Sequence, residues 1–166
     1  MSDDRTYEPV DLEGKYLTFN LMDEFYGVSV DWILQIIAIP SITKIPKTPV
    51  FVRGVINLRG KIIPVVDLRI KFMLPEKEYD ARTSIIIIKI KTDRGEVNIG
   101  IIVDKVIEVL DINENEIEKT PAFGTNVEMK FIHGMAKVKQ KVVSLLHIAN
   151  ILTESELSSL SQHSKN

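Results

Sequence analysis

The sequence contains an internal duplication, and this feature constrains the fold more than any other. Residues 51–68 (FVRGVINLRGKIIPVVDL) align without a gap on residues 131–148 (FIHGMAKVKQKVVSLLHI). Residues 27–37 (GVSVDWILQII) align in the same way on residues 100–110 (GIIVDKVIEVL). Two blocks that recur in the same order indicate two similar structural units.

The composition favours strands over helices. Forty of the 166 residues are Ile or Val and only five are Ala, and branched side chains suit a pleated sheet better than a helix bundle. Apolar residues also alternate with polar ones in segments separated by turn residues, which is typical of β-hairpins. The pattern predicts four hairpins, over residues 16–30, 54–66, 84–103 and 131–146.

The duplication and the hairpins together predict two small β-barrel lobes that pack on each other, because lobes of roughly 70 residues have marginal cores of their own. Thr153 and Glu156 form a capping-box pattern that predicts a C-terminal helix. The seam between the lobes is the expected place for a binding groove. The predicted organisation is a flexible segment, a first lobe, a second lobe, and a C-terminal helix with a frayed tail, over residues 1–14, 15–80, 81–152 and 153–166 respectively.

Composition and charge exclude several functions. The formal net charge is −2 and there are no cysteines, so the chain lacks the basic excess that nucleic-acid binding requires and cannot form disulfides or thiolate-ligated metal sites. No apolar run reaches the roughly 18 residues of a membrane-spanning helix. The amino terminus opens with acidic residues rather than a secretory signal. We therefore predict a cytoplasmic protein with no nucleic-acid partner and no direct membrane insertion.

Recognised enzyme motifs are absent: there is no nucleophile elbow, phosphate-binding loop, dinucleotide fingerprint or H-E-x-x-H. His133, His147 and His163 are far apart in sequence, so no metal site and no cofactor are predicted. A small hydrolase using aspartates would need Asp31, Asp67 or Asp104 to converge in a pocket. A small-molecule sensor with a ligand between the lobes is the other alternative.

The two copies differ most around the N-L-R-G turn of residues 57–60, which only the first copy has. Asn57 is interpreted as a turn residue rather than a partner contact, and Gly60 as the source of a positive φ. Arg59 is either solvated or offers its planar guanidinium to a partner's carboxylate or carbonyls. Asp67 is predicted to cap a short helix. The lysines of the first half are interpreted as solvated surface residues: Lys44, Lys47, Lys61 and Lys71.

Residues 48–69 (TPVFVRGVINLRGKIIPVVDLR) closely resemble the signature of the CheW family of bacterial chemotaxis coupling proteins, and the resemblance extends over about residues 15–152. It implies a mostly β fold of two five-stranded SH3-like barrels packed face to face. It also implies a non-enzymatic adaptor that links the cytoplasmic tips of chemoreceptors to the regulatory domain of the histidine kinase CheA, in arrays beneath the inner membrane. The alternative is a small-molecule-sensing or other peptide-binding module of a different signalling pathway.

The resemblance also implies two sets of binding residues. A receptor's helical hairpin is expected along the seam, on or near Ile33, Gln35, Gly54, Asn57, Arg59 and Val109. The kinase is expected to contact Ile39, Pro40 and Ile42. Many family members have a glutamate that can pair with the turn arginine where this chain has Gln35, while Glu108 holds the matching place in the second copy. A neutral partner reduces an ion pair to an ordinary hydrogen bond.

Overall fold

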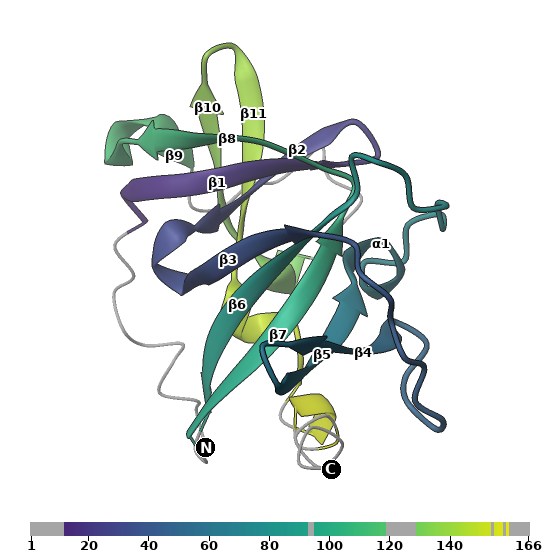
Figure 1. Ribbon diagram of the computed structural model, residues 1–166. Helices are drawn as coiled ribbons and strands as arrows, with labels where there is room; N and C mark the ends of the chain where they lie inside the picture. The colour runs from purple at the N-terminus through teal and green to yellow at the C-terminus, as the bar shows by residue number, and fades with distance from the viewer. Residues whose placement is uncertain (1–11, 93–94, 119–128, 154, 158, 160–166) are drawn as a thin grey trace.

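A computed structural model describes residues 12–92, 95–118, 129–153, 155–157 and 159. The fold consists of two curled sheets that pack against each other (Figure 1). One sheet has six strands in the order β8-β1-β2-β11-β10-β9, and the other has five in the order β3-β6-β7-β5-β4. The prediction of a mostly β protein with two small lobes is confirmed.

The elements have the following bounds. The strands of the six-stranded sheet are β1 (Gly14–Leu21), β2 (Glu24–Ser29), β8 (Lys105–Ile112), β9 (Ile117–Glu118), β10 (Ile132–Val138) and β11 (Lys141–Leu146). Those of the five-stranded sheet are β3 (Ile33–Ala38), β4 (Val52–Leu58), β5 (Lys61–Asp67), β6 (Ser84–Thr92) and β7 (Gly95–Val103). The short helical elements are η2 (Val30–Trp32), α1 (Leu68–Lys71), η3 (Glu114–Glu116), η4 (Met129–Phe131) and η5 (Ile148–Asn150).

Each sheet draws strands from both halves of the sequence. The first two strands of the chain, β1 and β2, belong to the sheet that contains β8, β10 and β11, while β6 and β7 join β3, β4 and β5. The expected lobes 15–80 and 81–152 therefore do not coincide with the sheets. The chain passes between the sheets at η2 and again at Asp104, so strands are exchanged between the two copies.

The duplication extends to the strand register. Gly27 of β2 lies opposite Leu145 in the parallel pair β2–β11, and Gly100 of β7 lies opposite Val65 in the parallel pair β5–β7. These four residues are equivalent pairs in the gapless alignments. The hairpin β4–β5 also has its register shift between Val52 and Gly54, which matches the shift between Ile132 and Gly134 in β10–β11.

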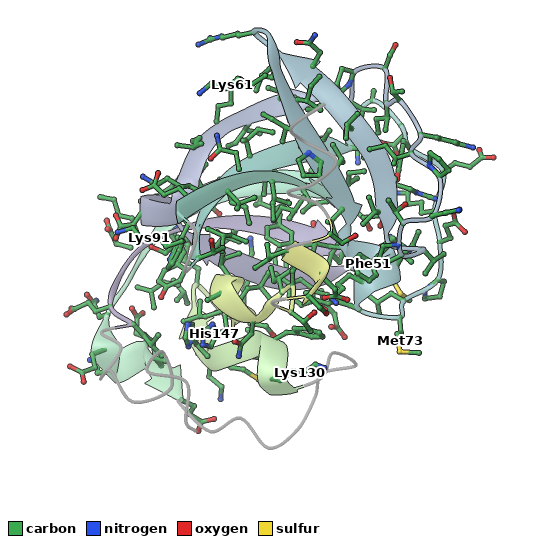
Figure 2. All side chains as sticks on the ribbon, turned by 90° about the horizontal axis from the view of Figure 1, so that it is seen from below. Phe51, Lys61, Met73, Lys91, Lys130 and His147 are labelled. Atoms are coloured by element: carbon green, nitrogen blue, oxygen red, sulfur yellow. The ribbon has the colours of Figure 1, made fainter. Side chains whose placement is uncertain are left out.

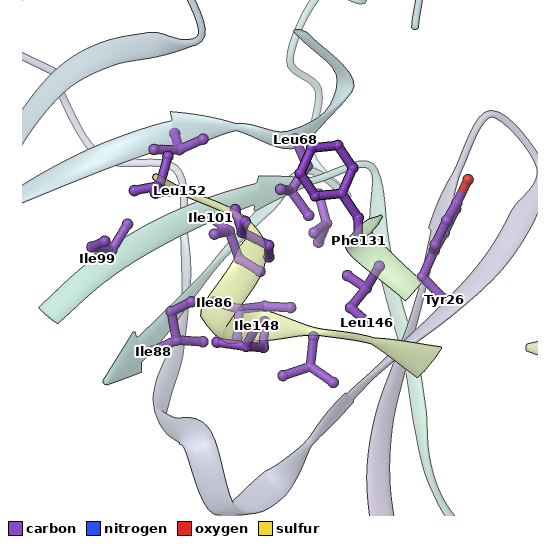
Figure 3. Packing of buried hydrophobic residues seen from close by; sticks show 14 of the residues in the cluster. Tyr26, Leu68, Ile86, Ile88, Ile99, Ile101, Phe131, Leu146, Ile148 and Leu152 are labelled. Carbon is purple, nitrogen blue, oxygen red and sulfur yellow. The ribbon is translucent and has the colours of Figure 1, made fainter. Parts of the chain in front are cut away.

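The main hydrophobic core lies between the two sheets. Strands of both sheets contribute to it, as do residues near the C-terminus (Figure 3). The residues labelled in that view are Tyr26, Leu68, Ile86, Ile88, Ile99, Ile101, Phe131, Leu146, Ile148 and Leu152. Each sheet also encloses a smaller cluster of its own, around Leu145 in one and Val65 in the other. Because burying one large apolar side chain contributes about 1.5–3 kcal/mol, the shared core makes each lobe depend on the other.

Local sequence signals behave as predicted at most termini. Asp67 caps α1 by accepting a hydrogen bond from the Ile70 N–H at 3.3 Å. Thr153 and Glu156 exchange hydrogen bonds, at 2.7 and 3.1 Å, at the start of the helical residues 155–157. The first hairpin turns at Met22 and Asp23, between β1 and β2. Most of the predicted flexible segment 1–14 lies outside the described residues; within the rest, Leu12 is buried and its carbonyl accepts a hydrogen bond from the Tyr16 hydroxyl. The predicted frayed tail, from Ser161 on, lies outside the described residues.

Candidate functional site

Arg59 lies exposed at the tip of the β4–β5 hairpin. Its φ is +54° and that of Gly60 is +84°, the pattern of a type I′ turn. The Gly60 N–H donates to Asn57 Oδ1 at 2.9 Å, so the predicted turn roles of Asn57 and Gly60 are both confirmed. A left-handed conformation at a non-glycine residue costs about 1–2 kcal/mol, and the chain accepts this cost at Arg59.

The guanidinium of Arg59 forms no ion pair with any side chain among the described residues. Its five N–H donors are therefore available to a partner. A planar, permanently charged group of this kind is suited to a carboxylate that approaches with both oxygens.

Gly54 is buried beneath the chain segment that closes the five-stranded sheet. Thr43 forms an isolated bridge with Val55, with N–O distances of 2.9 and 2.8 Å. A Cβ on Gly54 would lie 2.1 Å from the Thr43 carbonyl oxygen, and the φ of Gly54 is +143°. Gly54 thus permits the close approach of two backbone segments, strand β4 and the segment that contains Thr43.

The other predicted receptor residues lie on two edge strands. Ile33 and Gln35 are half-buried on β3, at the edge of the five-stranded sheet, and Ile33 packs against the shared core. Val109 is 52% exposed on β8, the edge strand of the other sheet. The set is therefore divided between the two sheets, with Arg59 in the same sheet as β3.

The predicted kinase residues lie between β3 and β4. Ile39 and Ile42 pack against the smaller cluster of the five-stranded sheet, and Pro40 is exposed. The more exposed apolar side chains are Leu34 and Ile36 on the outward face of β3, at 49% and 44%. Leu34 and Ile36 are not among the residues predicted from the sequence. Apolar residues at 33–34 and at 36–37 do indicate a strand with two apolar faces.

The second lobe has a charged counterpart of the Arg59 turn. Lys139 occupies the equivalent turn position with φ +52°. Its Nζ lies 3.4 Å from Oε1 of Glu108, and Lys141 Nζ lies 3.9 Å from Oε2 of the same carboxylate. Glu108 aligns with Gln35, so the two lobes differ in whether a carboxylate neutralises the turn cation.

A second pair of equivalent positions holds different polar networks. In the first copy, Arg53 Nε donates to the Tyr79 hydroxyl at 3.0 Å, and that hydroxyl donates to Asp67 Oδ2 at 2.7 Å. Burial, reinforced by the hydrogen bond to Asp67, raises the pKa of Tyr79 to about 12. In the second copy, the rings of His133 and His147 stack with centroids 3.9 Å apart. Burial and then the charge of His147 lower the pKa of His133 to about 4.

Two of the three aspartates that a hydrolase would need, Asp67 and Asp104, form structural contacts. Arg69 Nε donates to Asp104 Oδ1 at 2.7 Å. Burial raises the pKa of Asp104, but the hydrogen bonds from Arg69 and from the Met22 N–H outweigh it and hold that pKa below its ordinary value. Asp67 and Asp104 share a void of only about 10 Å³, too small for a substrate. A wider polar cleft of about 750 Å³ lies beside Arg69 and Asp104, and Asp31 is exposed elsewhere, on η2.

Neither a metal-binding cluster nor a membrane-spanning helix occurs among the described residues. They contain no group of three or more His, Cys, Asp or Glu side chains placed to hold a metal ion. No helix in the same part of the chain is long and apolar enough to cross a membrane.

The sequence is similar to those of known chemotaxis proteins. The sequence matches the CheW-like domain family over residues 15–156. It is 36% identical over 145 residues to the chemotaxis protein CheW of Thermotoga maritima, covering 86% of this chain and 89% of that protein. It is 32% identical over 143 residues to the CheW protein of Klebsiella aerogenes, covering 86% and 84%.

A solved structure shares the fold. The crystal structure of the scaffolding protein TtCheW from Thermoanaerobacter tengcongensis superposes with a TM-score of 0.77 at 36% identity, covering 87% of this chain and 96% of that one. The names of these relatives describe chemotaxis and scaffolding proteins rather than enzymes. The chain therefore belongs to the CheW-like family and has the non-catalytic, chemotaxis scaffold role of that family.

Proposed function

We propose that this protein couples the cytoplasmic tips of chemoreceptors to the regulatory domain of the histidine kinase CheA. It works in the cytoplasm, within receptor arrays beneath the inner membrane. Coupling is conformational: the protein holds receptor and kinase in a defined geometry and transfers no chemical group.

The observation that carries the receptor half of this proposal is the exposed, unneutralised guanidinium of Arg59 on a strained two-residue turn. A tight turn fixes where the charge is presented, so a receptor carboxylate meets a cation whose position is already set. Ile33 and Val109 add apolar contacts on the two sides of the seam, while Gly54 and Asn57 keep the turn and its strand in place. Buried apolar contacts supply most of the affinity and the charge sets the register.

The kinase half of the proposal rests on the outer surface of the five-stranded sheet. Pro40 lies exposed beyond the edge strand β3, with Ile39 and Ile42 half-buried beside it. Proline cannot donate a backbone hydrogen bond, so this segment resists unwanted strand pairing while presenting apolar surface. Leu34 and Ile36 extend that surface along β3.

The receptor assignment is tested by calorimetry of Arg59→Glu against a purified chemoreceptor signalling fragment. We expect binding at least about tenfold weaker, because an arginine at the centre of an interface commonly contributes more than about 1.4 kcal/mol. Lys139→Glu, at the equivalent turn of the other lobe, is the matched control and should change affinity far less. Equal affinities of the wild type and Arg59→Glu, with both folded, would refute the assignment.

A further inference from the structure

The chain passes between the two sheets at η2 and again at Asp104, and each crossing leads directly into an edge strand (Figure 1). The crossing at η2 leads into β3 of the five-stranded sheet, and the crossing at Asp104 leads into β8 of the six-stranded sheet. The two crossings are equivalent in the duplication, since Asp31 of η2 aligns with Asp104. Ile33 on β3 and Val106 on β8 both pack against the shared core, so the two edge strands border the same interface between the sheets.

The crossing at Asp104 is held by contacts to both sheets. Arg69 of α1, the helix that follows β5, donates from Nε to Asp104 Oδ1 at 2.7 Å and from Nη2 to Asp104 Oδ2 at 2.5 Å. The Met22 N–H donates to the same Oδ2 at 3.1 Å, and the Asp104 N–H donates to the Asn20 carbonyl at 3.2 Å. The side chains of Arg69 and Asp104 are only 12% and 13% exposed. Asp104 therefore joins the start of β8 and the β1–β2 hairpin to the helix that follows β5.

The crossing at η2 is held differently. Asp31 is exposed and forms no ion pair within the part of the chain that the structure describes. Its N–H donates to Ser29 Oγ at 3.3 Å, a local hydrogen bond. Extending the alignment by one residue places Ala149 at the position that Arg69 has in the first copy, so this position offers no cation to Asp31. Trp32 packs against the shared core, and this contact is apolar.

We propose that the Arg69–Asp104 ion pair positions the two sheets relative to each other and so sets the spacing of the edge strands β3 and β8, while the crossing at η2 is the place where that spacing can change. The inference rests on the proposed function, because the candidate receptor residues are divided between these two sheets. It adds Arg69 and Asp104 as positioning residues, which act through the placement of Ile33 and Val109.

An ion pair of this kind fixes geometry more than it adds stability. Apolar burial in the shared core holds the sheets together but is not directional, whereas a guanidinium that donates two parallel hydrogen bonds to a carboxylate fixes both distance and orientation. A buried ion pair often adds little to stability compared with neutral side chains of similar size, because both charges lose their hydration. A buried pair at one crossing and an exposed carboxylate at the equivalent crossing therefore indicate a positioning role.

The spacing of the edge strands can be measured with spin labels, because the chain has no cysteine of its own. Labels at the substitutions Leu34→Cys and Val109→Cys, on exposed positions of β3 and β8, report this spacing by pulsed electron paramagnetic resonance. Arg69→Met/Asp104→Asn removes both charges and keeps an acceptor for the Met22 N–H. In this variant we expect the distance distribution to broaden and its maximum to shift by about 1–2 Å or more, the scale of other interface rearrangements.

Two controls separate positioning from a general loss of order. A label pair within the five-stranded sheet, at Leu34→Cys and Lys61→Cys, should keep its distance distribution in the neutral variant. Lys61 is suited to a label because it is exposed and projects from the molecule (Figure 2). Lys15→Gln/Asp111→Asn removes an exposed ion pair of 3.0 Å within the six-stranded sheet, and should leave the distances between the Leu34 and Val109 labels unchanged.

Arg69→Lys keeps the charge but not the two-point contact. If the neutral variant unfolds, Arg69→Lys takes its place, and we expect its distance distribution to be broader than that of the wild type. Without labels, both variants should bind the receptor fragment several-fold more weakly by calorimetry, since only part of their population has the binding-competent spacing.

Hydrogen exchange of the wild type tests the role of η2. After correction for intrinsic rates, the Asp31 amide should exchange at least about tenfold faster than the equivalent Asp104 amide, because its hydrogen bond is local whereas that of Asp104 reaches β1. Equal protection of the two amides would overturn the assignment of η2 as the crossing that moves.

The outcomes separate the inference from the proposed function. If the wild type fails to bind the receptor fragment, the proposed function fails, and the label distances alone then decide whether Arg69 and Asp104 position the sheets. If the wild type binds and a folded variant of the pair keeps the wild-type distances, or binds with wild-type affinity, only the inference is overturned.

Discussion

The ammonium of Lys71 lies 3.0 Å from the carboxylate of Glu156, joining α1 to the C-terminal helix. The same ammonium lies 4.2 Å from the ring centroid of Phe51 and 5.8 Å from that of Phe131, two residues that are equivalent in the duplication. The Lys71 side chain is only 11% exposed. The prediction that Lys71 is a solvated surface residue is therefore wrong: it joins both copies and the C-terminal segment.

Removing the charge of Lys71 should weaken the contacts between α1, the two phenylalanines and the C-terminal helix, and so destabilise the fold. We expect Lys71→Gln to lower the free energy of unfolding by about 1–2 kcal/mol, through the lost ion pair and the lost cation–π contacts. Urea unfolding measures this, and a double-mutant cycle with Glu156→Gln isolates the pair. A coupling free energy below about 0.3 kcal/mol, typical of an exposed pair, would contradict the assignment.

Gly54 should be the least replaceable glycine of the β4–β5 hairpin. Gly54→Ala places a Cβ against the Thr43 carbonyl at a strained φ, and we expect a loss of roughly 3 kcal/mol or more in the free energy of unfolding. Gly60→Ala is the control: it shares a positive φ but has open space around it, so it should cost only about 1 kcal/mol. Equal losses of stability in the two variants, measured by thermal unfolding, would show that the close approach to Thr43 adds nothing to the cost of replacing Gly54.

The hydroxyl of Tyr79 should stabilise the buried carboxylate of Asp67, which is 2% exposed. Tyr79→Phe removes a donor to a charged group, and we expect a loss of about 1.5–3 kcal/mol. Tyr16→Phe removes a hydroxyl that donates to a neutral carbonyl, with an expected loss of about 0.5–1.5 kcal/mol. If both variants unfold at the same urea concentration, the hydrogen bond between Tyr79 and Asp67 contributes no more to stability than one to a neutral carbonyl.

The His133–His147 pair should make stability depend on pH. The pKa of His133 is about 4 in the folded state and about 6.5 when unfolded, so between these values the unfolded chain binds more protons. Stability therefore falls as pH decreases from about 6.5 to about 4. His133→Phe should remove about 2 kcal/mol of this loss, after discounting for partial exposure. Parallel pH slopes for the wild type and the variant would refute this.

Local features of the fold could be predicted from the sequence, while the pairing of its halves could not. Alternation, turn residues and caps act over a few residues, so the hairpins, the Asn57–Gly60 turn and the Asp67 cap are as predicted. The sequence does not predict that β1 and β2 exchange places with β6 and β7. The two hairpins have nearly the same apolar pattern, so either one could complete either sheet. Lys71 was missed because its partners, Phe51, Phe131 and Glu156, come from three distant segments.

Part of the candidate surface could be located from the sequence. The Arg59 turn could be found because it is the point where the two copies differ most. The outward pair Leu34 and Ile36 could not be separated from the core residues of β3 by composition, since both faces of that strand are apolar. Which face of β3 is buried depends on the residues that pack against it, and these come from distant parts of the sequence.

The coupling role is tested most directly by reconstitution. Purified protein is sedimented with a chemoreceptor signalling fragment and CheA, and kinase autophosphorylation is measured in the pellet with and without it. The account predicts that receptor control of autophosphorylation appears only when the protein is present, and that Arg59→Glu abolishes most of that control. Control that is unchanged by its omission, or a protein that remains in the supernatant with both partners present, would contradict it.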